Sequence, residues 1–236
     1  MKKLLLLFKP FGLVAETNSS SMANSQLRRH IDVVNYMIEL NFTKNSRILD
    51  LGCGIGLLAK RLKEAGFTNI TGADWLERDK VEYINSLDNY IQIDLNELDE
   101  NLQKKFKNEI YDVVISSDVM EHLKNPSSFF RNINSITDSN SEIIISIPNA
   151  FNLIQRLFIL FTGNSTRYKV EKKNEFGHIT LVTSNIMQSL LNRIDLKVVD
   201  KKGGGMFLGG LSFLPKKSLS IKYSYSIIYR IKRKIL

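Results

Sequence analysis

The stretch DLGCGIG, from Asp50 to Gly56, holds the residues whose types and spacing point most directly to chemistry. An apolar run precedes it and helix-forming residues follow it, so the pattern predicts a strand, a glycine turn and a helix. Doubly wound sheets bind nucleotides at such a corner, because residues without side chains let a ligand lie against the backbone. The spacing is G-x-G-x-G, and Leu57 stands where the dinucleotide pattern requires its third glycine. Asp50 would repel a diphosphate but suits a cationic ligand, such as a sulfonium with an amino group.

Two further carboxylates follow the next two predicted strands. Asp74 lies about twenty residues beyond the glycine turn, where an acidic side chain can accept hydrogen bonds from both ribose hydroxyls. Asp94 can accept from an adenine amino group, while the adjacent Leu95 packs on the ring. Trp75 either packs on the adenine or anchors the helix that follows. Any one aspartate could simply cap a helix, but acids at the ends of three successive strands together favour a nucleoside site.

Short apolar runs and helical stretches alternate along the chain and predict the elements that position these residues. Strands are expected at 47–51, 69–72, 90–93, 111–116 and 142–147, and helices at 26–40, 57–65, 126–136 and 184–194. This alternation predicts an α/β fold with a doubly wound, mostly parallel sheet and helices on both faces. We expect an N-terminal lead at 1–25, the nucleotide-binding domain at 26–200 and a C-terminal tail at 201–236.

Residues 151–161 are strongly apolar and interrupt the alternation just after the fifth predicted strand. The segment is too short to span a bilayer. Within an insert at 151–180, we expect either a buried helix or lid over the carboxyl edge of the sheet, or a wall for an apolar substrate.

The net charge of +9 comes entirely from residues 201–236, which contain nine Lys and Arg and no Asp or Glu. The rest of the chain has 24 basic and 24 acidic residues. Basic residues interleaved with Tyr and Ile in this tail predict contact with an anionic surface, either lipid headgroups or nucleic acid. A neutral body does not suggest a broad phosphate-binding face, so a nucleic-acid partner is not favoured.

The cysteine content limits the class of protein and its compartment. A single cysteine, Cys53, cannot form an internal disulfide, and one Cys with three His cannot build a structural zinc cluster. We therefore predict no metal and a cytoplasmic protein, with the tail at the inner membrane face. The sequence has no run of about 18 apolar residues, so no membrane span is predicted. Lys9-Pro10 interrupts the signal-like start, so no cleaved signal is expected.

Four motifs together resemble the class I S-adenosylmethionine-dependent methyltransferases: DLGCGIG at 50–56, GADW at 72–75, QIDLNE at 92–97 and YDVVISSDVMEHLKNP at 111–126. The likeness covers about residues 30–200 and implies a Rossmann-like, seven-stranded sheet with S-adenosylmethionine across the carboxyl ends of its first strands. The candidate cofactor-binding residues are Asp50, Gly52, Cys53, Gly54, Gly56, Asp74, Trp75, Asp94, Leu95 and Ser117. Members of the family commonly end in an antiparallel strand, which the glycine-rich stretch at 203–210 makes hard to locate here.

The stretches EHL-NP, EIIISIPN and FGHITLVT are similar to a branch of small-molecule and glycan O-methyltransferases that includes quinone-biosynthesis and cell-surface sugar enzymes. This placement implies methyl transfer to an oxygen of a small-molecule or glycan acceptor. A quinone or lipid-linked acceptor is the alternative. A metal-dependent, catechol-type site would require a further cluster of carboxylate and amide side chains. The sequence shows no sign of one, so such a site is not predicted.

Histidine is the side chain best matched to removing a hydroxyl proton at neutral pH. His178 is the favoured base, because it lies between the insert and the next helix and the resembling family has a histidine there. His122 follows Glu121 after the fourth strand and either acts near the methyl group or ties the loop to the backbone. His30 is expected to be a helix residue beside Arg28 and Arg29. One of those arginines either reaches the cofactor's carboxylate or lies on a solvated face.

Two other function classes fit the sequence less well. An RNA or DNA methyltransferase acting on exocyclic amines would have an Asn/Asp-Pro-Pro-aromatic run after the fourth strand, where this sequence has Ser-Ser-Asp-Val at 116–119. A non-catalytic binding module would keep the fold and lose the chemistry, and the intact glycine turn and acids argue against it.

Overall fold

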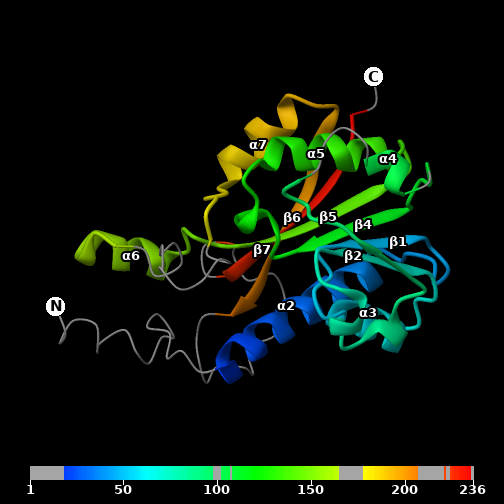
Figure 1. Cartoon of the computed structure of the whole chain (residues 1–236). Coiled ribbons are helices and arrows are strands. Elements are labelled where there is room, and N and C mark those ends of the chain that lie inside the picture. Colours follow the sequence, from blue (N-terminus) through cyan, green and yellow to red (C-terminus); the bar gives the residue numbers. More distant parts are fainter. Residues whose placement is uncertain are drawn as a thin grey trace.

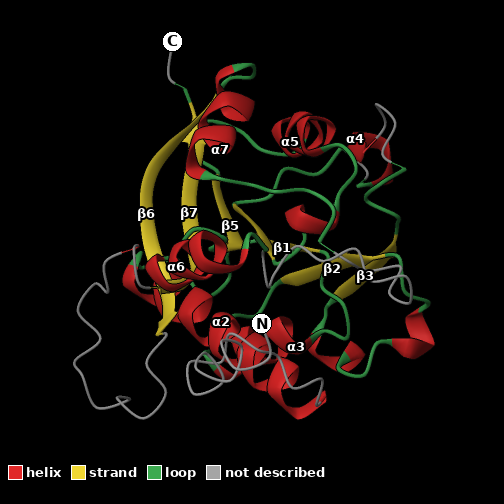
Figure 2. Cartoon of the chain, turned by 90° about the vertical axis from the view of Figure 1, so that its left-hand side faces the viewer, coloured by secondary structure: helices red, strands yellow, loops and turns green. Residues whose placement is uncertain are grey.

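A computed structural model of the chain describes residues 19–97, 102–106, 108–164, 178–206, 221 and 224–234. Most of the predicted N-terminal lead, part of the insert and part of the tail lie outside these residues. Together the described segments form one mixed sheet with helices on both of its faces, as Figures 1 and 2 show.

The sheet has seven strands in the order β3-β2-β1-β4-β5-β7-β6. In chain order the strands are β1 (Ile48–Leu51), β2 (Ile70–Asp74), β3 (Asn89–Gln92), β4 (Val113–Ser117), β5 (Glu142–Pro148), β6 (Leu196–Met206) and β7 (Ser224–Arg233). Strands β1 to β5 run parallel, and β7 is antiparallel to both β5 and β6. The chain order reverses between β1 and β4, which is where doubly wound sheets bind their ligands. The predicted seven-stranded, mostly parallel sheet is confirmed.

Helices on the two faces of the sheet enclose two apolar cores. They are α2 (Ser19–Glu39), α3 (Leu57–Glu64), α4 (Leu102–Lys105), α5 (Pro126–Ser135), α6 (Leu153–Thr162) and α7 (Ser184–Asn192). Figure 1 shows α4, α5 and α7 on one face, and α2 and α3 on the other. Phe129 of α5 and Met187 of α7 belong to the first core, whereas Met37 of α2 and Leu62 of α3 belong to the second.

Local sequence accounts for where several helices begin. Asn125, Asn152 and Thr183 each precede a helix and accept a hydrogen bond from a backbone N–H of its first turn. Such caps satisfy donors that a helix leaves unpaired at its start. The carboxyl edge of the sheet therefore meets helix N-termini at fixed positions.

The prediction that residues 201–236 form a separate tail is wrong for the residues that the structure describes. Strand β6 continues across the expected boundary at 200, and β7 lies inside the sheet between β5 and β6. Tyr229 is 1% exposed, and Arg230 and Lys232 both pair with Glu142 of β5. These basic residues neutralise an internal carboxylate, so they are not available to an anionic surface. Strand β7 is the terminal antiparallel strand that the sequence left unlocated.

The apolar segment, expected as either a buried helix or lid or a wall for a substrate, forms helix α6, and most of this helix is not buried. It projects from the body of the molecule in Figure 1, and Leu160 and Phe161 are 74% and 63% exposed. Only one side of the helix contacts the protein, where Phe158 is 4% exposed. An apolar composition did not lead to burial here because no second layer covers the helix in the described part of the chain. None of the described helices is long and apolar enough to cross a membrane.

Candidate functional site

The glycine turn after β1 is held against the loop after β4. Gly52 has a φ of 79°, and its N–H donates to the Ala73 carbonyl of β2 at 2.7 Å. A methyl group at Gly52 would collide with the side chain of Val119, so only glycine fits this approach. At Gly54, where φ is 52°, nothing lies within 4 Å of where a side chain would begin. The turn thus leaves open space above Gly54, as a cradle for a ligand requires.

Asp50 and Asp74 lie beside this cradle and differ in their partners. One carboxylate oxygen of Asp74 accepts from the N–H of Gly54 at 2.7 Å, and the other accepts from the N–H of Leu76 at 3.2 Å. Asp50 is 1% exposed, and its Oδ2 has no hydrogen-bond partner among the described residues. Burial, and then the charge of Asp74, raises the pKa of Asp50 to about 7. A buried carboxylate with an unsatisfied oxygen is unfavourable by itself, and a cation bound beside it would remove that penalty.

The remaining nucleoside candidates lie at the ends of β2 and β3. Trp75 follows Asp74 and is 53% exposed, so it does not anchor a helix in the core. Asp94 is exposed, and its Oδ1 accepts from the N–H of Asn96 at 2.8 Å, which is a local turn contact. Leu95 is partly buried against the first core. Cys53 is buried, and burial raises the pKa of its thiol, which agrees with a small packing side chain rather than a nucleophile.

The loop after β4 begins with two polar contacts. The hydroxyl of Ser117 lies 2.8 Å from that of Ser146 on the neighbouring β5. Asp118 adopts a left-handed backbone conformation with a φ of 57° and forms an ion pair with Arg29 of α2. Arg29 therefore does not lie on a solvated face, since only 13% of its side chain is exposed. His30, the next residue, is part of α2 as expected.

The structure brings together the two histidines that the sequence offered as alternatives. The rings of His122 and His178 lie 5.0 Å apart between centroids, and Nε2 of His178 lies 3.9 Å from Oε1 of the buried Glu121. The N–H groups of Ile179 and Thr180 both donate to the Glu121 carbonyl, at 2.9 and 3.0 Å. These bonds attach the segment after the insert to the loop after β4, across more than fifty positions of sequence.

This group of Glu121, His122 and His178 could act in two ways. It could move a proton, since two imidazoles lie near a buried carboxylate. It could also hold a cation, because one candidate ligand atom from each residue lies within 4.8 Å of the others. The sequence analysis predicted no metal. The adjacent Glu121 and His122 were the only local sign in the sequence of a possible metal-binding group.

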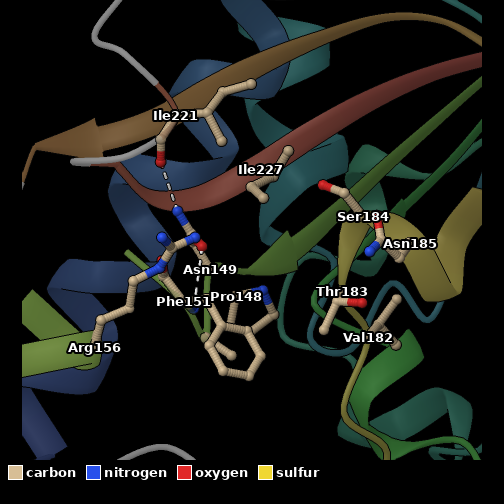
Figure 3. A pocket seen from close by; sticks show the side chains of 11 residues that line it. Pro148, Asn149, Phe151, Arg156, Val182, Thr183, Ser184, Asn185, Ile221 and Ile227 are labelled. Atoms are coloured by element: carbon tan, nitrogen blue, oxygen red, sulfur yellow. Dashed lines mark hydrogen bonds between the residues drawn. The ribbon is translucent and has the colours of Figure 1, made fainter. Parts of the chain in front are cut away.

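A cavity of about 340 Å³ opens at the carboxyl end of β5, as Figure 3 shows. Its walls come from the end of β5, the first turns of α6 and α7, and the start of β7. The lining residues are Pro148, Asn149, Ala150, Phe151, Arg156, Val182, Thr183, Ser184, Asn185, Ile221 and Ile227. The amide nitrogen of Asn149 donates to the carbonyls of Ile221 and Ser224, so this side chain holds the wall in place.

Sequence reasoning missed three of the residues that this edge of the sheet assembles: Asp118, Arg156 and the acid Glu121 in its buried position. For Glu121 the sequence did offer a signal, because an acid followed by a histidine comes just after the fourth predicted strand. Nothing local marked Arg156, because its place in the cavity depends on how α6 meets the sheet.

A sheet in this order, with a glycine turn after β1 and carboxylates at the ends of β1 and β2, defines a Rossmann-like protein that binds a nucleoside cofactor. A family model described as a methyltransferase domain matches residues 22–201, and the chain belongs to this family. The predicted resemblance to class I S-adenosylmethionine-dependent methyltransferases is confirmed, and S-adenosylmethionine is the cofactor that the family uses.

Curated relatives include two proteins named ubiquinone biosynthesis O-methyltransferase. The one from Rickettsia akari is 28% identical over 156 residues, covering 66% of this chain and 61% of the relative. The one from Rickettsia canadensis is 35% identical over 102 residues, covering 43% of this chain and 42% of the relative. The matches thus span less than two thirds of these relatives.

Solved structures with the same fold are more distant in sequence. Magnesium protoporphyrin IX methyltransferase from Synechocystis, with bound S-adenosylhomocysteine (SAH), is 18% identical with a TM-score of 0.56, covering 96% of this chain and 92% of that one. An S-adenosylmethionine-dependent methyltransferase from Clostridium acetobutylicum is 14% identical with a TM-score of 0.61, covering 99% of both chains.

Proposed function

We propose that this protein transfers the methyl group of S-adenosylmethionine to a hydroxyl oxygen on the ring of a quinone-type small molecule. The observation that carries the proposal is the meeting of His178, His122 and the buried Glu121 at the loop after β4, whose Val119 lies against Gly52 of the glycine turn. The cluster supplies a base at the edge of the sheet where the family binds its cofactor. The names of the Rickettsia relatives support a quinone-type acceptor rather than a glycan.

The residues of the glycine turn fit the cofactor. We assign Gly52, Gly54 and Gly56, with Cys53 between them, to the backbone cradle, and the unpartnered oxygen of Asp50 to the cationic end of the cofactor. Asp74 keeps a lone pair on each oxygen for the ribose hydroxyls after its two backbone bonds.

The adenine end would be held by side chains from the ends of β2, β3 and β4. Trp75 is exposed enough to cover the ring, and Leu95 would pack on it. Asp94 would accept from the exocyclic amine with the oxygen that does not bind Asn96. Ser117 lies at the end of β4, where its hydroxyl is held by Ser146.

Bound S-adenosylmethionine supplies an activated methyl group, so that the acceptor oxygen forms the new C–O bond as the S–C bond breaks and its electron pair goes to sulfur. The protein must orient the hydroxyl and accept its proton. We assign the proton to His178, whose imidazolium the Glu121 carboxylate 3.9 Å away would stabilise.

The nucleic-acid alternative loses part of its support in the described part of the chain. It depended on the basic tail, and Arg230 and Lys232 are paired with Glu142, while Arg233 donates to Asn134. We therefore retain a small-molecule acceptor.

A thermal-shift titration with SAH, beside NADH and ATP, tests the cofactor assignment. A ligand that binds only the native state at about a hundredfold excess over its Kd stabilises it by about 2.7 kcal/mol. We expect a shift with SAH alone, and a smaller one in Asp74→Asn. Asp79→Asn is the matched control, since Asp79 is exposed a few residues further on. A shift with NADH instead would leave only the fold.

Methylation of a dihydroxyphenyl acceptor then tests the reaction. Wild-type protein with labelled S-adenosylmethionine should transfer label to catechol-type compounds and not to simple sugars. Label found only on sugars would refute the quinone-type assignment.

A further inference from the structure

We propose that the cavity between α6 and α7 is the acceptor site and that Arg156 binds an anionic group on the acceptor. The acceptor would then be an aromatic hydroxyl compound that also carries a carboxylate or a phosphate. This inference rests on the proposed function and specifies the substrate class.

The size and walls of the cavity suit one substituted ring. A volume of about 340 Å³ lies near the small end of the range for ligand pockets, roughly 300 to 1,000 Å³. Phe151, Val182, Ile221 and Ile227 provide apolar surface on its walls. In Figure 3 the Phe151 ring and the Val182 side chain lie on the lower side of the cavity, with Ile221 and Ile227 above.

The charge of the lining has one sign. Among the described residues that line the cavity, Arg156 is the only charged one, and none is Asp or Glu. The Nε–H of Arg156 donates to the Phe151 carbonyl at 2.8 Å, which fixes the plane of the guanidinium. Its two terminal nitrogens have no hydrogen-bond or ion-pair partner among the described residues. A guanidinium whose plane is set in this way is suited to bidentate binding of a carboxylate or phosphate.

Two helix N-termini reinforce the positive potential at this place. The cavity is lined by Phe151 and Arg156 at the start of α6, and by Thr183, Ser184 and Asn185 at the start of α7. Both helices have nine or more residues, and their aligned peptide dipoles place partial positive charge at these ends. An anion is therefore favoured over a neutral or cationic group.

The cavity is also close to the candidate base along the chain. Val182 of the cavity wall is four residues from His178, which limits their Cα separation to about 14 Å even for a fully extended chain. Strands β4 and β5 are parallel neighbours, so Glu121, just after β4, and Pro148, the last residue of β5, lie at the same edge of the sheet. An acceptor anchored at Arg156 would thus lie at the edge that holds the histidine cluster.

Binding to the full chain tests the anion preference directly. The probes are benzoate, phenyl phosphate and benzamide, the last being the neutral counterpart of benzoate, titrated by NMR with SAH present. We expect benzamide to bind at least tenfold more weakly than one of the two anions. Arg156→Gln should abolish that difference, while Arg193→Gln, an exposed arginine at the other end of α7, should preserve it. Tighter binding of benzoate than of phenyl phosphate would assign a carboxylate, and the reverse order a phosphate.

Equal binding of benzamide and both anions, or unchanged anion affinity in Arg156→Gln, would overturn the inference. The SAH affinity, measured on the same samples, separates this failure from that of the proposed function. If wild-type protein does not bind SAH, the proposed function fails. If SAH binds equally to wild type and Arg156→Gln, a loss of anion preference is specific to the cavity.

Methyl transfer provides the second measurement. The acceptors 3,4-dihydroxybenzoate and 3,4-dihydroxybenzamide share a ring and both hydroxyls and differ in charge. We expect kcat/KM for the benzoate to exceed that for the benzamide by about tenfold or more in wild type, with the difference in KM, and to equal it in Arg156→Gln. Equal values in wild type would contradict the assignment.

Discussion

Arg29 of the N-terminal helix α2 forms a buried ion pair with Asp118, the first residue after β4. Strands β1 to β4 lie between these two residues in the sequence. The ion pair nevertheless joins α2 to the loop that carries Glu121 and His122. Asp118 holds a left-handed backbone conformation with a φ of 57°, which aspartate and asparagine tolerate better than most residues.

Removing one partner of this pair should destabilise the protein more than removing both. Arg29→Gln removes the cation beside the largely buried Asp118 carboxylate, and we expect a loss of about 3 kcal/mol in the free energy of unfolding. Asp118→Asn should cost a similar amount without straining the backbone. The double variant should recover part of the loss, as urea denaturation can measure. Additive losses in the double variant would show that the two side chains do not interact.

Gly52 should be the least replaceable glycine of the turn. Gly52→Ala must adopt a positive φ, at a cost of about 1–2 kcal/mol, and must also displace Val119. Gly54→Ala meets open space and has only the backbone cost. We therefore expect Gly52→Ala to lose more stability than Gly54→Ala, and Val119→Ala to restore part of that loss. Equal losses in the two alanine variants would mean that the contact with Val119 does not matter.

The pKa of Asp50 predicts a pH dependence of both stability and cofactor affinity. Because burial raises this pKa to about 7 from the usual acidic range, folding favours the protonated form. Its contribution to stability is present at about pH 4 and is lost as the pH rises through about 7. Without cofactor, Asp50→Asn should therefore gain stability relative to wild type above that pH.

A cationic cofactor has the opposite preference, since it binds best when Asp50 is ionised. Affinity for S-adenosylmethionine, measured by calorimetry, should rise about tenfold between pH 6 and 8 in wild type. In Asp50→Asn the rise should be absent. A rise of the same size in the variant would locate the titrating group elsewhere.

His30 should make the protein sensitive to acid. Burial, followed by the charges of Arg61 and Arg29, lowers its pKa to about 4, so the native state holds it neutral. The stabilisation is present above about pH 6.5 and is lost as the pH falls towards 4, by up to about 3 kcal/mol. His30→Gln should flatten the loss of stability over this interval in urea denaturation at each pH. A wild-type slope in the variant would exclude His30 as its source.

The five parallel strands were predictable because each contains a short apolar run. Strands β1, β2, β4 and β5 are buried along their whole length, whereas the edge strand β3 is partly exposed. Strand β7 was not predictable, because its basic residues look solvent-exposed until Glu142 of β5 is known to pair with them. That partner lies 88 positions away from Arg230 and no local pattern reveals it.

The candidate site was likewise predictable from the sequence only in part. Asp50 and Asp74 were identified because they follow strands and flank a glycine turn. His122 and His178 were identified only as separate alternatives, and their contact depends on hydrogen bonds between the segment at 179–180 and Glu121. The position of Arg156 depends on where α6 begins relative to the sheet, which is a property of tertiary packing.

The assignment of His178 as the base can be separated from a structural or metal-binding role by combining variants with chelation. His178→Gln should lower kcat by about 100-fold or more without changing SAH affinity, because only proton removal is lost. His122→Gln should have a smaller effect, since the Glu121 carboxylate would still face His178. Activity should persist in EDTA. Loss of activity in EDTA that Mg²⁺ restores would instead assign the three residues to a bound cation, and unchanged kcat in His178→Gln would remove this histidine from the reaction.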